Sequence, residues 1–148
     1  MAIAQNLSPQ VLGKAEKAHA ALLDRILEGT PLTYHHWVAF TLVSAADGRI
    51  NVGVLVESMT SALKIDDARA RTAIGELTEL HLIEPALSDA PGIQLTDEGQ
   101  ATYRRIRTAV DETIGILYSD ISDDELATAG RVLTLITDRA NAELARAS

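Results

Sequence analysis

The chain opens with apolar side chains that recur every three or four residues. Between residues 8 and 28 the recurring positions are Val11, Ala15, Ala18, Leu22 and Ile26. Because an α-helix turns once in 3.6 residues, this spacing gathers the apolar side chains on one helical face. The sequence therefore predicts an amphipathic helix over residues 8–28 that ends at Gly29.

The next segment is apolar in a different way. Pro31 interrupts the chain, and Thr33 is a suitable N-cap for a second helix over residues 34–46. The apolar side chains of this helix point in nearly every direction, at Trp37, Val38, Phe40, Leu42 and Val43. A helix without a polar face is normally buried, so we expect it at the centre of the domain.

Two more helices are predicted after a turn at Asp47-Gly48 and a very short strand over residues 49–51. The third helix covers residues 52–59. Asp66 is a suitable N-cap for the fourth helix, which reaches about residue 80. The inner face of the fourth helix is expected to carry Ala70, Ala73 or Ile74, Leu77 and Leu80.

The helical period stops after the fourth helix. Residues 82–87 and 93–95 are short apolar stretches on either side of residues 88–92, Ser-Asp-Ala-Pro-Gly. Two short apolar runs that flank a segment rich in turn-forming residues are typical of a β-hairpin. The sequence therefore predicts two strands joined by a loop.

Two long helices are predicted in the rest of the chain. Asp97 and Glu98 place negative charge in the first turn of one helix, where the helix dipole favours it. Ser122 and Glu125 form the capping box of the other. The apolar stripe of the first helix is Tyr103, Ile106, Val110, Ile114, Leu117 and Ile121, and that of the second is Leu126, Ala129, Leu133, Ile136, Ala140 and Leu144.

This order of elements predicts a mainly α fold in one domain that spans residues 1–148. Three helices and the hairpin form a winged helix-turn-helix lobe over residues 32–99, with long helices over residues 8–28 and 100–146 on either side. Burying one side chain of leucine size contributes about 1.5–3 kcal/mol, so the striped flanking helices favour association. We expect a two-fold homodimer in which these flanking helices are the dimerisation helices.

The composition excludes several classes of protein. Hydrophobic residues make up 47% of the chain, which indicates a globular protein rather than a disordered one. There is no cysteine, so disulfides, thiolate nucleophiles and cysteine metal sites are excluded. The chain contains no apolar run long enough for a membrane span, and its first ten residues lack the pattern of a secretion signal. A cytoplasmic protein without a membrane partner is expected.

The charge of the chain weighs against nonspecific binding to nucleic acid. The formal net charge is −8. Residues 49–85 contain four basic and six acidic side chains, and residues 86–99 contain three acidic and no basic ones. Phosphate contacts need Lys or Arg, so any binding to DNA should involve few phosphates and depend only weakly on salt.

Four segments resemble the MarR family of bacterial transcriptional regulators, in the order in which that family has them. The resemblance covers roughly residues 22–144. The segments are Leu32-Thr33-Tyr34-His35-His36-Trp37, residues 75–84, Leu95-Thr96-Asp97-Glu98-Gly99 and Ile121-Ser122-Asp123-Asp124-Glu125-Leu126.

The resemblance implies a triangular homodimer with two lobes that read double-stranded DNA. It also implies a repressor that releases DNA when a small aromatic ligand binds between lobe and base. The fourth helix would enter the major groove, and the positions that match its first turns are Arg69, Ala70, Arg71 and Thr72. Arg suits guanine, and Thr can bond a base or a phosphate. Lys64 and Arg49 are expected to contact phosphates.

The chain departs from the family at three positions near the wing. His81 stands where the family often has Gly, Pro85 where it often has Arg, and Asp89-Ala90-Pro91 at the wing tip lacks the usual Arg. These departures support a second hypothesis. A winged-helix dimer with weak or lost DNA binding would act as a protein-interaction or ligand-binding module.

Trp37, His36 and Tyr103 are the candidate ligand-binding residues, by analogy with the family. Alternatively, Trp37 is a residue of the hydrophobic core and binds no ligand. His35 and His36 could bind a metal, but neighbouring helical residues point about 100° apart and cannot easily chelate one ion. No metal or other cofactor is therefore predicted.

The densest basic cluster, Arg104, Arg105 and Arg107, is better explained as a solvated face paired with Glu98 and Asp111 than as a DNA contact. An enzyme is not expected either. The sequence has no Gly-x-Ser-x-Gly motif, no phosphate-binding glycine loop and no cysteine nucleophile.

Overall fold

The computed structural model describes residues 6–87 and 92–146, in which six helices and three short strands follow one another. The chain divides into two compact parts, residues 1–111 and 112–148. The elements are α1 (Pro9–Leu27), α2 (Tyr34–Ala45), β1 (Arg49–Ile50), α3 (Val52–Leu63), α4 (Asp67–Glu79), β2 (Ile83–Pro85), β3 (Ile93–Leu95), α5 (Asp97–Leu117) and α6 (Asp123–Arg146).

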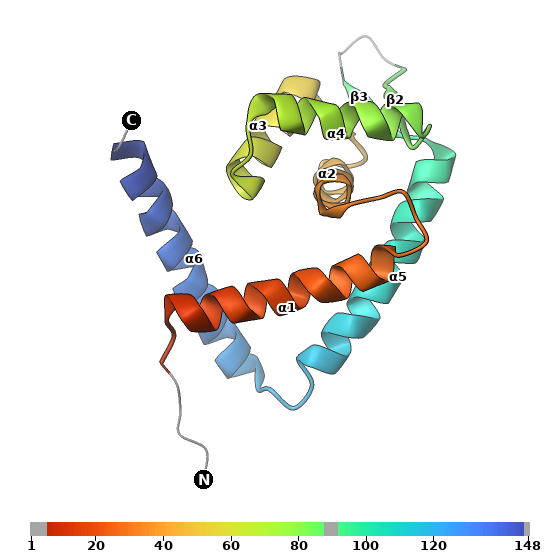
Figure 1. Cartoon of the computed structure of the whole chain (residues 1–148). Coiled ribbons are helices and arrows are strands. Elements are labelled where there is room, and N and C mark those ends of the chain that lie inside the picture. Colours follow the sequence, from red (N-terminus) through yellow and green to blue (C-terminus); the bar gives the residue numbers. More distant parts are fainter. Residues whose placement is uncertain (1–5, 88–91, 147–148) are drawn as a thin grey trace. The chain divides into compact units, whose positions relative to one another are not determined.

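Helix α2 occupies the centre of the first part, as its apolar sequence predicts. It contacts α1, α3, α4, β1 and β3, and Figure 1 shows it nearly end-on beside α3 and α4. Ala39, Phe40 and Val43 are almost completely buried. The core around them is one cluster to which α1, α3, α4, β2, β3 and α5 each contribute at least one buried side chain.

Polar side chains determine where the helices of this part begin. Ser8 Oγ accepts a hydrogen bond from the Val11 amide at 3.2 Å, and Asp66 Oδ1 accepts one from the Arg69 amide at 2.8 Å. Each satisfies an amide of the first helical turn that has no partner within the helix. The predicted N-cap at Asp66 is confirmed.

Helix α3 differs from its prediction at its C-terminal end. It continues to Leu63, four residues beyond the predicted end at Met59, and stops at Lys64, whose φ of 56° is left-handed. Met59 and Leu63 both pack in or against the core. The packing of these apolar side chains on the core therefore explains the extra turn. The β-branched residues at the start of the helix give no sign of this packing.

The three strands form one antiparallel sheet in the order β1-β3-β2. Ile50 pairs with Ile93, and Ile83 pairs with Leu95. The short strand and the hairpin are therefore confirmed, although β2 ends at Pro85 rather than at residue 87. The predicted wing tip at Asp89-Ala90-Pro91 lies outside the described residues.

The Leu-Thr-x-x-Gly segment, residues 95–99, joins the sheet to α5, and its contacts explain why Thr and Gly occupy their positions. Thr96 Oγ1 donates to the His81 carbonyl at 2.7 Å and accepts from the Gly99 amide at 2.9 Å, so it connects the end of α4 to the start of α5. A Cβ added at Gly99 would lie 1.9 Å from the Leu82 carbonyl oxygen, which only glycine avoids. His81 has a φ of 61° and thus occupies the left-handed position at which glycine is favoured.

The second part contains the end of α5 and the whole of α6. Ser122 caps the start of α6 as predicted, because its Oγ accepts from the Glu125 amide at 3.1 Å. The second contact differs from that of a capping box, because the Glu125 carboxylate accepts from the Ser122 hydroxyl, at 3.0 Å, and not from the Ser122 amide. No residue of α6 is buried. Two residues of its apolar stripe, Ile136 and Leu144, are at least 40% exposed, as is Leu135 beside the stripe.

Candidate nucleic-acid interface

Helix α4 has one buried face and one polar face. Ala70, Ala73, Ile74 and Leu77 are buried against the core and hold the helix in place. Ala70 is completely buried, so its side chain faces the core rather than the polar face. Its position on the inner face, which the apolar spacing predicted, is confirmed.

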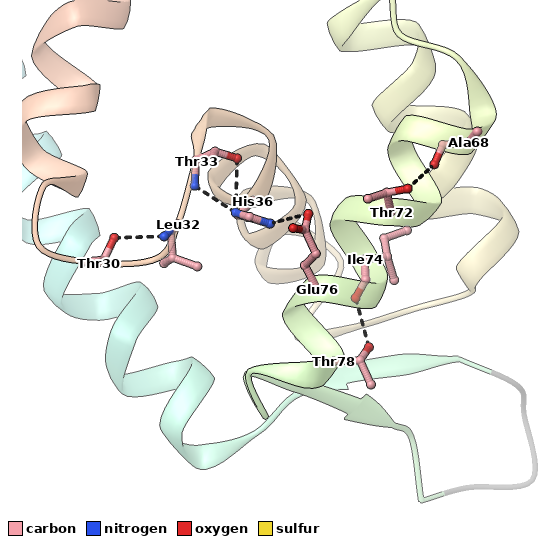
Figure 2. A network of polar contacts seen from close by, with 9 residues as sticks. All are labelled: Thr30, Leu32, Thr33, His36, Ala68, Thr72, Ile74, Glu76 and Thr78. Atoms are coloured by element: carbon pink, nitrogen blue, oxygen red, sulfur yellow. Dashed lines mark hydrogen bonds and ion pairs between the residues drawn. The ribbon is translucent and has the colours of Figure 1, made fainter.

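The polar face carries the predicted reading residues Arg69, Arg71 and Thr72, all exposed. Successive helical residues step by about 100°, so the two arginines flank Thr72. The Thr72 hydroxyl donates to the Ala68 carbonyl at 2.9 Å, as Figure 2 shows. The residue is exposed, and a hydroxyl that donates one hydrogen bond can also accept one from a partner molecule.

Acidic side chains share this polar face. Arg71 Nε donates to Asp67 Oδ2 at 2.7 Å, one helical turn away. Glu76 and Glu79 follow towards the end of the helix and are also exposed. The charge of Arg71 is therefore partly neutralised by a neighbouring carboxylate.

The two expected phosphate contacts come from elements on either side of α3. Lys64 is exposed at the left-handed residue that follows α3, and its ammonium group donates to the Ser61 carbonyl at 2.8 Å. Arg49 is exposed on β1, where it pairs with Gln94 of β3. Sheet and helix thus each supply one cation outside α4.

The structure brings two of the three candidate ligand-binding residues together. The Trp37 and Tyr103 rings are stacked with centroids 5.3 Å apart, and Phe40 meets Tyr103 edge-on at 6.4 Å. These contacts join α2 to α5. Trp37 and Phe40 are buried, so the cluster forms part of the core.

His36 lies in a polar network at the start of α2 (Figure 2). The Thr33 amide donates to His36 Nδ1 at 2.8 Å, which leaves the ring proton on Nε2. His36 Nε2 lies 3.3 Å from Glu76 Oε1 and donates to it. Both ring nitrogens of this buried side chain are therefore engaged, one in capping α2 and the other in a contact with α4.

The His36–Glu76 contact is a feature that the sequence did not reveal, because 40 residues separate the two side chains. The sequence did contain a signal for the other contact of His36, the one with Thr33. Thr33 and His36 have the spacing of a capping box, with His in the place of the usual Glu or Gln. Within the described residues, no group of three or more His, Asp or Glu side chains could hold a metal ion.

The basic cluster of α5 lies partly in ion pairs. Arg107 Nη2 is 2.9 Å from Asp111 Oδ1, so the predicted pairing with Asp111 is confirmed. Arg104 and Arg105 are exposed. None of the helices described here is long and apolar enough to cross a membrane.

A central helix, a two-helix turn unit and a three-stranded sheet define the winged-helix class of folds. No protein-family model and no curated protein matches the sequence. Solved structures do match. A MarR-family transcriptional regulator from Silicibacter pomeroyi DSS has a TM-score of 0.76 at 19% identity over 91% of this chain and 90% of its own.

Two further structures show the same likeness. A MarR protein from Peptoclostridium difficile has a TM-score of 0.75 at 17% identity, over 100% of this chain and 98% of its own. CouR from Rhodococcus jostii RHA1, bound to p-coumaroyl-CoA, has a TM-score of 0.70 at 18% identity, over 86% of this chain and 88% of its own. The chain therefore has the winged-helix fold of the MarR regulators.

Proposed function

We propose that this chain is a MarR-family transcriptional regulator, a homodimer that binds double-stranded DNA and acts as a ligand-responsive repressor. The observation that carries the proposal is the polar face of α4. In a winged-helix fold, Arg69, Arg71 and Thr72 are held outward by a buried opposite face, where they can enter a major groove. Lys64 and Arg49 would add phosphate contacts.

The apolar surface of the second part supports the homodimer. Ile116, Leu117, Tyr118 and Ile121, around the end of α5, are all more than one-third exposed, and α6 buries none of its residues. A second copy of the chain would cover such surface, and each covered side chain of this size contributes about 1.5–3 kcal/mol. In this proposal residues 8–28 and 100–146 form the dimer base and residues 32–99 the lobe that binds DNA.

A small aromatic molecule is the proposed effector. The structural neighbour CouR is bound to p-coumaroyl-CoA, which carries an aromatic group. Trp37 and Tyr103 present aromatic rings of the kind that stack on such a group. Because these rings stack on each other and both His36 nitrogens are engaged, a ligand there would have to displace existing contacts. Such displacement couples binding to a change in the lobe.

Fluorescence anisotropy on the DNA that flanks the gene of this protein tests the proposal, with salt varied. The double variant Arg69→Ala/Arg71→Ala should abolish saturable binding. The matched control Arg104→Ala/Arg105→Ala removes the same charge from α5 and should retain it. Because phosphate contacts are few, we expect a shallow log–log salt slope. A slope as steep as that of a strongly basic repressor would contradict this.

A second function is favoured by one observation, the absence of basic residues from residues 86–99. A winged-helix dimer with weak or lost DNA binding would serve as a protein-interaction or ligand-binding module. The same titration distinguishes the two. A folded dimer that fails to bind DNA at low salt supports the module, whereas binding that the α4 double variant abolishes supports the regulator.

A further inference from the structure

Asp67 and Arg71 form an ion pair along the first two turns of α4. Arg71 Nε donates to Asp67 Oδ2 at 2.7 Å, and both side chains are more than half exposed. The pair therefore lies on the polar face of α4, the surface proposed above to enter the major groove. Any base that Arg71 contacts would also lie near this carboxylate.

The two neighbouring carboxylates at the start of α4 have different partners. Asp66 is the N-cap, and its Oδ1 accepts from the Arg69 amide. The Oδ2 of Asp67 instead accepts from a guanidinium group. The start of α4 is thus already capped without Asp67, whose negative charge would repel DNA phosphates. A charge that opposes affinity at a reading surface is consistent with a role in selectivity.

We propose that Asp67 determines sequence specificity by holding Arg71 in the orientation that reads guanine. With Nε engaged by Asp67, the Nη1 and Nη2 atoms of Arg71 remain as donors that match guanine O6 and N7. This inference rests on the proposed DNA-binding function and deepens it.

The pair contributes little to folding, because exposed ion pairs are weak. Its removal therefore reports on recognition. Selection from a library of duplexes with a random central segment, followed by titration of the selected sequence and its single base-pair variants, measures that recognition. The proteins compared are the wild type, Asp67→Ala, Arg71→Ala and their double variant, each verified as folded by its thermal melt.

Asp67→Ala should bind random DNA more tightly. Its preference for one G·C pair over the other base pairs should fall about tenfold. Arg71→Ala should lose preference at the same base pair, and the double variant should lose no more, because Asp67 acts through Arg71. Glu79→Ala is the matched control. It removes the same charge from the other end of α4, so it should bind random DNA more tightly with its preferences unchanged.

Two outcomes would overturn the inference, and they differ from each other. If Asp67→Ala binds every sequence more tightly and keeps all wild-type preferences, Asp67 is only a charge at a helix end, while DNA binding itself stands. If the folded wild-type dimer selects no sequence, the DNA-binding function fails and the inference fails with it.

Discussion

In the first part of the chain, side chains from five helices and two strands converge on one core in which Phe40, Leu55 and Met59 are fully buried. In the second part, α6 carries an equally regular apolar stripe but buries none of it. The two parts obey the same spacing rule, but only the first buries its apolar side chains to the same degree. A stripe therefore predicts a helix but not what covers it.

The largest expected effect is on the core of the first part. Phe40→Ala removes a ring that is completely buried and meets Tyr103 edge-on. Such truncations destabilise proteins by about 3–5 kcal/mol, because they leave a cavity. Urea denaturation should show this loss equally at low and high protein concentration if the first part is stabilised from within. If the loss of stability disappears at high protein concentration, the first part is not stabilised by its own core alone.

The second prediction compares a glycine-to-alanine substitution in the first part with one in the second part. Gly99→Ala places a Cβ against the Leu82 carbonyl and should cost about 3 kcal/mol, because backbone must move. Gly130→Ala in α6 meets nothing within 4 Å and should raise stability by up to about 1 kcal/mol, since alanine favours helices. The free energy of unfolding measures both. Equal effects would show that the approach of α5 to the Leu82 carbonyl is not tight.

The third prediction concerns the exposed stripe of α6. Ile136→Glu should weaken a homodimer by about 2 kcal/mol, because a charge replaces an apolar side chain at the proposed interface. Sedimentation at several concentrations measures the shift towards monomer. Thr134→Glu is the control, since residue 134 lies about 200° around the helix. If both variants dissociate alike, the stripe is not the interface.

Much of the fold could be predicted from local chemistry. Thr33, Asp66 and Ser122 were each expected to cap a helix and do so, because capping depends on residues within one turn. The apolar spacing of α4 placed Ala70 on the inner face, and Ala70 is completely buried. This prediction succeeded because burial follows the helical period.

What local chemistry could not predict depends on distant residues. The end of α3 is determined by contacts with the core rather than by its own sequence. The partner of His36 is Glu76, on a helix whose position depends on the packing of the whole lobe. On the polar face of α4, the spacing of four residues permits the ion pair between Asp67 and Arg71, whereas which of the nearby carboxylates Arg71 engages depends on the rotamers.

The smallest expected effect separates the two roles of His36. His36→Ala removes the acceptor of the Thr33 amide and the contact with Glu76, and should destabilise the first part by about 1 kcal/mol or slightly more. His36→Gln should recover most of this loss, because Gln at that position also accepts from the N-cap amide. Both free energies come from urea denaturation. If Gln recovers nothing, the contact with Glu76 outweighs the cap, and the buried imidazole contributes mainly by fixing α4 against α2.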